Sequence, residues 1–238
     1  MKTFQDLQEG LQDPNIFKAF FLAGGPGSGK SYVVRATTGG TGLRIVNSDD
    51  VFEKYLKDAG FDMDMSTAKA EREAEERDKM RKRAKKLTRT RMGDVTTGEG
   101  GYLEGRIGLI IDGTGKDYDK IAKQATQLKQ LGYDVHMIFV NTSLDTALER
   151  NAKRERTVPE DVAVKSWNAV QRNIGKFSQY FRQNFVVVDN NDADEDVLTP
   201  VFKQIKGLLK KPVRSPIAKQ WVRQEMKRRG ITRAPKGF

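Results

Sequence analysis

The sequence predicts an α/β fold, in which a parallel, doubly wound sheet of about five strands carries helices on both faces. Short apolar runs alternate with amphipathic or charged segments of helical length, as expected for strands joined by crossover helices. A glycine-rich turn follows the first apolar run, and aspartates follow the next two. Because open sheets of this kind bind ligands at the carboxyl ends of their strands, we expect the functional site at that edge.

The length of 238 residues allows one such domain with a modest extension. We expect the domain over residues 1–192, with a helical insertion at about 62–105, and a basic helical extension over 193–238. A short amphipathic helix and a turn at residues 13–15 lead into the first strand.

The first predicted strand, residues 19–23 (AFFLA), runs directly into residues 24–31 (GGPGSGKS), which fit the phosphate-loop pattern GxxxxGK[ST]. The glycines let backbone N–H groups converge on a phosphate, and the helix that opens near Lys30 adds its positive end. We expect Lys30 to reach the β- and γ-phosphates of ATP, and the Ser31 hydroxyl to hold Mg²⁺. A glycine-rich turn without a ligand is the alternative. The predicted ATP-binding residues of the loop are Gly25, Gly27, Ser28, Gly29, Lys30 and Ser31.

The second predicted strand, residues 43–46, follows a helix that ends at a glycine pair and leads into the tetrapeptide NSDD. Either Asp49 or Asp50 could accept a proton from an acceptor hydroxyl, because that role needs a carboxylate within hydrogen-bond reach. Alternatively, one of the two helps to hold Mg²⁺ through water. Paired aspartates after a strand also commonly cap the next helix.

Residues 66–91 predict a highly charged helix, acidic in its first half and basic in its second, which suits the helix dipole. Ser66 or Thr67 is the expected N-cap. The segment is either a solvated helix with internal ion pairs or an insertion that overhangs the acceptor side of the cleft. The glycine-rich stretch 93–105 predicts a mobile loop.

The third predicted strand is an apolar run that begins at residue 107 and ends in Asp112, followed by Gly113. This run corresponds to a Walker B strand, although an Asp-Gly pair is also common in ordinary turns. The predicted metal ligands are Ser31, Asp50 and Asp112.

The remaining elements alternate in the same way: a helix at 117–131, a strand at 134–141, helices at 144–154 and 159–180, and a strand at 185–189. His136 lies inside a strand, so a structural position is expected for it. Arg150 and Arg154 are four residues apart, so they would share a helix face, and their forked donors match phosphate oxygens. Together with Arg156 they could form a lid over ATP, although basic residues near a helix end also suit the dipole. The aromatic residues expected in the core of the long helix are Trp167, Phe177, Tyr180 and Phe181.

The net charge of +11 is concentrated in the tail, where residues 206–238 hold eleven lysines and arginines against Glu225 alone. Such a segment suits DNA or RNA, but it is also typical of a solvated helix. Trp221 in this tail could stack on a base or anchor the helix to the domain.

Composition excludes several kinds of site. The chain has no cysteine and one histidine, so we expect no disulfide-linked partner, no thiolate metal site and no Ser-His nucleophile. No signal peptide is evident, and no apolar run approaches the ~20 residues needed to cross a bilayer. We therefore expect a soluble, cytoplasmic protein without a membrane partner.

The order GGPGSGKS, NSDD, LIIDGTG and LERNAKRERTVPEDV resembles the kinase domain of bacteriophage polynucleotide kinases and the related zeta-toxin kinases, over residues 18–190. The most specific piece is RNAKR at residues 150–154, followed by VP and DV. The resemblance implies a P-loop NTPase fold, a phage-encoded protein acting in a bacterial host, and Asp49 as the general base. It also implies that Arg150 and Arg154 are lid arginines that contact the ATP phosphates and the transition state.

Two positions depart from the polynucleotide kinases on the acceptor side rather than the ATP side, and a third concerns a phosphatase domain. Phe52 stands where they carry an acceptor-binding arginine, and Gly113 stands where they carry an acceptor-side aspartate. Ile110 replaces the nucleophilic aspartate of the phosphatase domain found in some relatives, so no such domain is expected.

The predicted function is an ATP-dependent phosphotransferase that moves the γ-phosphate to a hydroxyl acceptor, with a nucleic-acid 5′-hydroxyl favoured by the basic tail. One alternative is a zeta-toxin-like kinase of a nucleotide sugar or another small metabolite. Another is an ATP-regulated nucleic-acid-binding module. The predicted catalytic residues are Lys30, Asp49, Arg150 and Arg154, with ATP and Mg²⁺ as cofactors.

Overall fold

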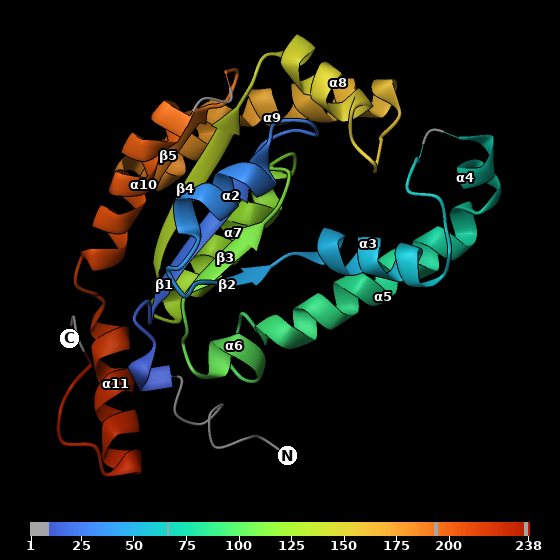
Figure 1. Ribbon diagram of the computed structural model, residues 1–238. Helices are drawn as coiled ribbons and strands as arrows, with labels where there is room; N and C mark the ends of the chain where they lie inside the picture. Colours follow the sequence, from blue (N-terminus) through green and yellow to red (C-terminus); the bar gives the residue numbers. More distant parts are fainter. Residues whose placement is uncertain (1–9, 66, 193–194, 236–237) are drawn as a thin grey trace.

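The computed structural model describes residues 10–238 except 66, 193–194 and 236–237. Within these residues, five parallel strands form a sheet in the order β2-β3-β1-β4-β5 (Figure 1). This confirms the predicted α/β fold with a parallel, doubly wound sheet. The strands are β1 (Lys18–Ala23), β2 (Arg44–Val46), β3 (Leu109–Asp112), β4 (Asp134–Asn141) and β5 (Phe185–Asp189).

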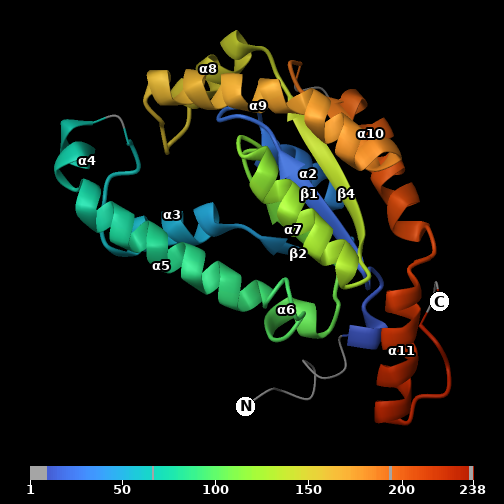
Figure 2. The ribbon, with the colours of Figure 1, turned by 180° about the vertical axis from the view of Figure 1, so that it is seen from behind.

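Helices cover both faces of the sheet because successive strand side chains point to opposite faces. Phe20 and Leu22 of β1 face the layer formed by α2 (Lys30–Thr38) and α10 (Glu195–Lys210). Ala19, Phe21 and Ala23 of β1 face α7 (Tyr118–Gln130) and α9 (Glu160–Phe181), the layer seen from behind in Figure 2. The phosphate loop therefore leaves the buried central strand of a three-layer core.

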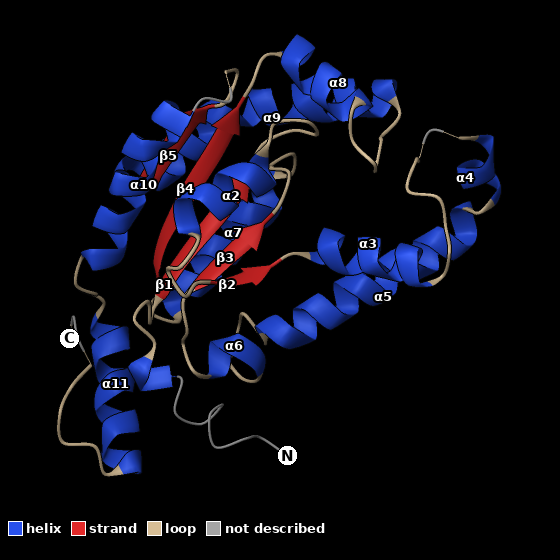
Figure 3. Ribbon diagram, in the orientation of Figure 1, coloured by secondary structure: helices blue, strands red, loops and turns tan. Residues whose placement is uncertain are grey.

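The chain between β2 and β3 forms a helical insertion beside the sheet (Figure 3). Its helices are α3 (Ser48–Asp58), α4 (Ala68–Arg72), α5 (Ala74–Met92) and α6 (Gly101–Glu104). The insertion buries an apolar cluster of its own between α3 and α5, consisting of Phe52, Leu56, Met63 and Ala84.

Two local expectations for the insertion were wrong. The single helix predicted over residues 66–91 is divided at Glu73, whose carboxylate accepts from Arg77 at 2.7 Å while Arg77 also donates to the carbonyl of Asp62. Those bonds tie the junction to the preceding loop. The stretch predicted as a mobile loop contains α6. Thr67 is the N-cap of α4, whereas Ser66, the other candidate, lies outside the described residues, as does most of the predicted N-terminal helix.

The two helices of the C-terminal segment have different surroundings. α10 buries four apolar side chains against the sheet: Leu198, Val201, Ile205 and Leu208. α11 (Pro216–Arg229) packs at the amino end of β1, at the opposite end of the sheet from the phosphate loop (Figure 1). Its Trp221 lies edge-on to the Phe17 ring, 5.5 Å between centroids, and under the guanidinium of Arg106. Of the two roles open to Trp221, the structure therefore shows the anchor.

None of the helices in the described part of the chain combines the length and apolar character needed to cross a bilayer.

Candidate active site

The phosphate loop joins β1 to α2 and is enclosed by the end of the sheet and by α8 (Leu144–Ala152). Gly27 has a φ of +76°, and a Cβ at this position would collide with the carbonyl oxygen of Ala147 in α8. Gly29 has a φ of +80° and faces the side-chain amide of Asn190, which donates to the carbonyl of Ser28 at 2.8 Å. These positions need glycine for both conformation and space.

Lys30 begins α2, and its ammonium group donates to the carbonyl oxygens of Gly24 and Gly25 at 2.6 and 3.1 Å. Burial lowers the pKa of Lys30, and the charge of Arg154 lowers it further, whereas Asp112 and Asp49 raise it. An ammonium group has three N–H donors. Lys30 can therefore turn toward a phosphate oxygen while staying held at the loop.

Asn47 links the ends of two neighbouring strands. Its side-chain oxygen accepts from the backbone N–H of Asp49 at 2.7 Å, so it is the N-cap of α3. Its amide nitrogen donates to Asp50 at 2.9 Å and to Asp112 at 3.0 Å. The capping alternative for the aspartate pair is therefore wrong, because Asn47 takes that role.

The three aspartates form an acidic group facing Lys30. Burial raises the pKa of Asp112 to about 6, and the charges of Asp49 and Asp50 add to this while Lys30 opposes it. Burial and the neighbouring Asp49 also raise the pKa of Asp50. Neighbouring negative charges disfavour the ionised form of each carboxyl group, which is why they raise these pKa values. The described residues contain no group of three or more acidic, histidine or cysteine side chains with the geometry of a metal site.

Arg156, in the loop between α8 and α9, reaches across to α3. Its Nη2 lies 3.5 Å from Asp49 Oδ2, and its Nε lies 3.4 Å from Glu53 Oε1. The Arg156 side chain is only 16% exposed, and its buried Nη1 has no hydrogen-bond partner among the described residues. Asp49 is 54% exposed and is the aspartate that contacts Arg156, so it is open to an incoming acceptor beside that arginine.

The two predicted lid arginines are separated. Arg150 donates to the backbone carbonyls of Asn190 and Asn191 at 2.5 and 2.9 Å, which ties α8 to the turn after β5. Arg154 lies beyond the end of α8 at Ala152 and is exposed. The expectation that both share one helix face was wrong because the helix ends earlier. Arg154 is nevertheless close enough for its charge to act on Lys30.

The long helix α9 places its aromatic residues in two environments. Phe177 and Phe181 are buried in the core, and Tyr180 packs against it, as predicted. Trp167 is not in the core: its Nε1 donates to the carbonyl of Thr142 at 3.0 Å, and its backbone lies 3.5 Å from the position of a Cβ on Gly25. Its helical spacing matched the core pattern, and only the fold places it beside the phosphate loop. His136 is 3% exposed and stacked on Phe20, as expected for a strand position.

Sequence reasoning missed Asn47, Glu53 and Asn190. Asn47 was visible as the residue between a strand and the aspartate pair, and its cap position could have been expected. Glu53 contacts the lid loop (residues 153–159, between α8 and α9), and Asn190 contacts the phosphate loop. Neither residue carries a local signal, because the loop that it contacts is distant in the chain.

Residues 20–176 match the family model described as AAA domain. No curated protein matches the chain. Among solved structures, the complex of AvrRxo1-ORF1 and AvrRxo1-ORF2 with ATP is similar at 18% identity and a TM-score of 0.50, over 76% of this chain and 57% of that one.

Two further structures are similar at a TM-score of 0.48. The PezAT toxin-antitoxin system of Streptococcus pneumoniae has 18% identity over 95% of this chain and 91% of that one. A gluconokinase from Sinorhizobium meliloti 1021 has 14% identity over 82% and 97%. At these identities the solved structures establish the fold alone.

Proposed function

This chain belongs to the AAA domain family and is a P-loop kinase, an enzyme that transfers phosphate to a hydroxyl acceptor, and we propose that its acceptor is a small molecule. Asp49 and Arg156 lie on the acceptor side and Lys30 on the donor side, and the charge of Asp112 acts together with those of Lys30 and Asp49. Donor and acceptor groups thus meet at the carboxyl ends of three adjacent strands. The observation that carries the proposal is the bond from the Met65 N–H to the Thr157 carbonyl, 3.0 Å, which joins the insertion to the loop between α8 and α9.

The phosphate loop and Lys30 bind the phosphates of ATP in this proposal. The loop N–H groups surround the β-phosphate, and the Lys30 ammonium contacts the β- and γ-phosphates. Arg154 adds positive charge over the γ-phosphate, where its charge already acts on Lys30. Arg150 acts through position, because its bonds to Asn190 and Asn191 hold α8 against the loop.

The oxygen donors beside the loop fit Mg²⁺. Ser31, Asp50 and Asp112 would hold the ion together with phosphate oxygens and water, because Mg²⁺ needs only one or two protein carboxylates. The raised pKa values of Asp50 and Asp112 show acidic groups that a cation would relieve. When bound, the ion neutralises charge on the transferring phosphate.

Asp49 is the general base of the proposed reaction. Its carboxylate takes the proton of the acceptor hydroxyl, the hydroxyl oxygen forms a bond to the γ-phosphorus, and the bond to the β-phosphate oxygen breaks to release ADP. Arg156 holds Asp49 at 3.5 Å and keeps one buried N–H group without a partner. That donor is suited to an oxygen of the acceptor or of the transferred phosphate.

Three features support a small acceptor. The side chain of Phe52 is 1% exposed, so this side chain itself offers no contact to a nucleic-acid strand. The basic helix α11 packs at the other end of the sheet and is too distant to hold an acceptor beside Asp49. The lid loop is joined to the insertion by the bond from the Met65 N–H to the Thr157 carbonyl, 3.0 Å, which narrows access to the cleft.

A nucleic-acid 5′-hydroxyl is the second candidate, and one observation favours it. The insertion helix α5 presents a shallow basic groove whose lining residues are Lys82, Lys85, Lys86, Arg89 and Thr90. A strand lying along this groove would approach the cleft from the α3 side, because α3 and α5 pack together.

The test is a transfer assay with γ-labelled ATP and Mg²⁺, in which 5′-hydroxyl DNA, 5′-hydroxyl RNA and a panel of small polyols, sugars, nucleotide sugars and hydroxy acids are offered separately. Lys30→Ala is the inactive control. A K82E/K85E/K86E variant tests the basic groove. Label on a small molecule, unchanged in the groove variant, is the expected result. Label on nucleic-acid ends that is lost in the groove variant would establish the second candidate and overturn the first.

A further inference from the structure

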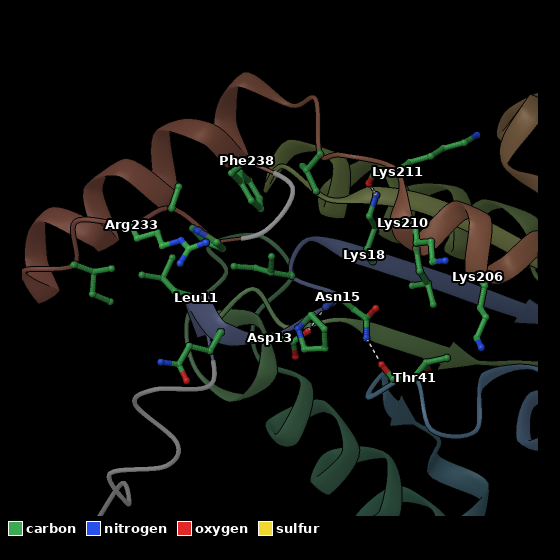
Figure 4. A pocket seen from close by; sticks show the side chains of 18 residues that line it. Leu11, Asp13, Asn15, Lys18, Thr41, Lys206, Lys210, Lys211, Arg233 and Phe238 are labelled. Carbon is green, nitrogen blue, oxygen red and sulfur yellow. Dashed lines mark hydrogen bonds between the residues drawn. The ribbon is translucent and has the colours of Figure 1, made fainter.

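A second pocket, of about 980 Å³, lies on the side of the molecule away from the phosphate loop (Figure 4). It is bounded by residues 11–16 before β1, by the end of α10, and by the segment after α11. Its volume is in the range of small-molecule sites, which is roughly 300–1,000 Å³. None of the residues proposed for phosphate transfer lines it.

The pocket has an apolar interior. The apolar side chains that line it include Leu11, Ile16, Leu209, Val213, Ile231 and Phe238. Leu11, Ile16 and Val213 are almost fully buried, at 3 to 4% exposure, so they form a fixed wall. The apolar part of a ligand bound there would be removed from water, and it would displace no charged group.

The opening of the pocket is basic. Lys206 and Lys210 come from α10, Lys211 follows that helix, and Arg233 faces them from the other side (Figure 4). All four are exposed, and in the described part of the chain none forms a salt bridge. The only carboxylate in the lining is that of Asp13, which accepts from the Asn15 backbone. The excess of positive charge at the opening favours a ligand that carries an anionic group.

A buried cation lies at the inner wall. Lys18 is 2% exposed, and its ammonium donates to Asp134 at 2.7 Å and to the Lys211 carbonyl at 2.8 Å. Its third N–H has no partner among the described residues. Two residue pairs further along β1 and β4, both ring nitrogens of buried His136 also lack partners among the described residues. The Lys18 ammonium and the His136 ring therefore have hydrogen-bonding positions that no described residue of the protein fills.

We propose that this pocket binds a soluble small organic anion, whose apolar body lies against the apolar wall and whose carboxylate or phosphate group pairs with the lysines and Arg233 at the opening. The site is independent of the proposed phosphate transfer, because it lies at the other end of the sheet. It gives the molecule a second, non-substrate ligand site.

The test uses the fluorescent anion 1-anilinonaphthalene-8-sulfonate, titrated into the full chain in the presence of saturating ATP and Mg²⁺, which occupy the phosphate loop. Octyl phosphate below its micelle concentration and inorganic phosphate serve as competitors. Leu209→Trp places a large ring at the pocket wall, and K206E/K210E/R233E reverses the charge of the opening. The matched control is K82E/K85E/K86E, which reverses a similar charge on α5. Circular dichroism checks that each variant is folded.

The wild type and the α5 control should bind the dye with affinities within about twofold of each other, and octyl phosphate should displace it while inorganic phosphate does not. Both pocket variants should weaken binding by about tenfold or more, since each loses apolar or ionic contacts. If Leu209→Trp is unfolded, the surface charge variant alone decides. Absence of dye binding in the wild type, or an equal loss in the α5 control, would overturn the proposal.

Discussion

Around the phosphate loop, contacts are made by backbone atoms and buried side chains, whereas the insertion and the loop between α8 and α9 meet through ion pairs and one backbone hydrogen bond. Gly27 lies against the backbone of Ala147, and Asn190 donates into the loop. On the other side, Lys57 pairs with Glu155 at 3.1 Å, with both side chains more than half exposed. Exposed pairs contribute only about 0–1 kcal/mol each.

The insertion has its own apolar cluster, in which Phe52 and Leu56 are almost fully buried, while its other end packs in the main core through Met92 and Leu103. The end that contains α3 can therefore keep its internal structure while its distance from the loop between α8 and α9 changes. The difference indicates that packing fixes the donor site, whereas the acceptor site depends on an end of the insertion whose position can change. Four predictions test this comparison.

On the donor side, a large effect on ATP binding is expected for Gly27→Ala. The added Cβ meets the Ala147 carbonyl, and alanine is strained at a φ of +76°, which costs about 1–3 kcal/mol of stability. Because the loop must shift, we expect ATP binding to weaken by at least about a hundredfold, or ~2.7 kcal/mol. Calorimetric titration with ATP and thermal denaturation measure both effects.

Gly207→Ala in α10 is the matched control, since a Cβ at that position meets nothing within 4 Å. It should leave ATP binding unchanged and stabilise the fold by about 0.5–1 kcal/mol. Wild-type ATP affinity in Gly27→Ala would show that the loop is not fixed by this contact.

Arg156→Gln should affect the acceptor side without affecting ATP binding. We expect the transfer rate to fall by about 10²–10³, because charge stabilisation at the transferring phosphate is worth at least this much in related chemistry. ATP affinity should stay within about twofold of wild type. Arg172→Gln, an exposed arginine on α9, is the control. Equal losses in rate and ATP affinity would contradict a role of Arg156 in the transfer step rather than in ATP binding.

Asp112→Asn is expected to stabilise the protein at neutral pH in the absence of Mg²⁺. The pKa of Asp112 is raised from 3.8 to about 6, so between these values the folded state holds a proton that the unfolded chain has released. Wild-type stability therefore falls as pH rises through this window, at a cost on the order of 3 kcal/mol by pH 7.

The variant removes this cost and should be the more stable protein at pH 7, while the two should converge near pH 4. Denaturant unfolding in EDTA across this pH range measures the difference. A variant that is less stable than wild type at pH 7 would mean that the Lys30 charge outweighs burial at this site.

Glu155→Gln should have the smallest effect. It breaks the exposed pair with Lys57, so the free energy of unfolding should change by less than about 1 kcal/mol. The Michaelis constant for the acceptor should rise modestly in the variant, and it should depend less on salt concentration than in the wild type. A change of several kcal/mol would show that the insertion is held more firmly than its contacts suggest.

The sequence predicts the strands and the phosphate loop well, because both depend on local patterns. The apolar runs at 134–141 and 185–189 are β4 and β5 without any change of boundary, and the loop lies where the pattern GxxxxGK[ST] places it. The charged segment 66–91 was less well predicted, because its division at Glu73 depends on a bond from Arg77 to Asp62.

The acceptor side could be predicted only in part. NSDD and the aspartate after the third run indicated an acidic group, but the bridge made by Asn47 depends on the pairing of β2 with β3. The pairing of Arg156 with Asp49 joins segments that only the fold brings together. Trp167 was misplaced because a helical period identifies a buried face without saying what covers it.

The most direct test of the central claim is the transfer rate of Asp49→Asn on the acceptor found in the panel, measured together with its ATP affinity. Asp119→Asn, an exposed aspartate in the first turn of α7, is the control. We predict a rate lower by about 10²–10⁴, as for loss of a general base, with ATP affinity unchanged. Wild-type transfer by Asp49→Asn would contradict the assignment of Asp49 as the base.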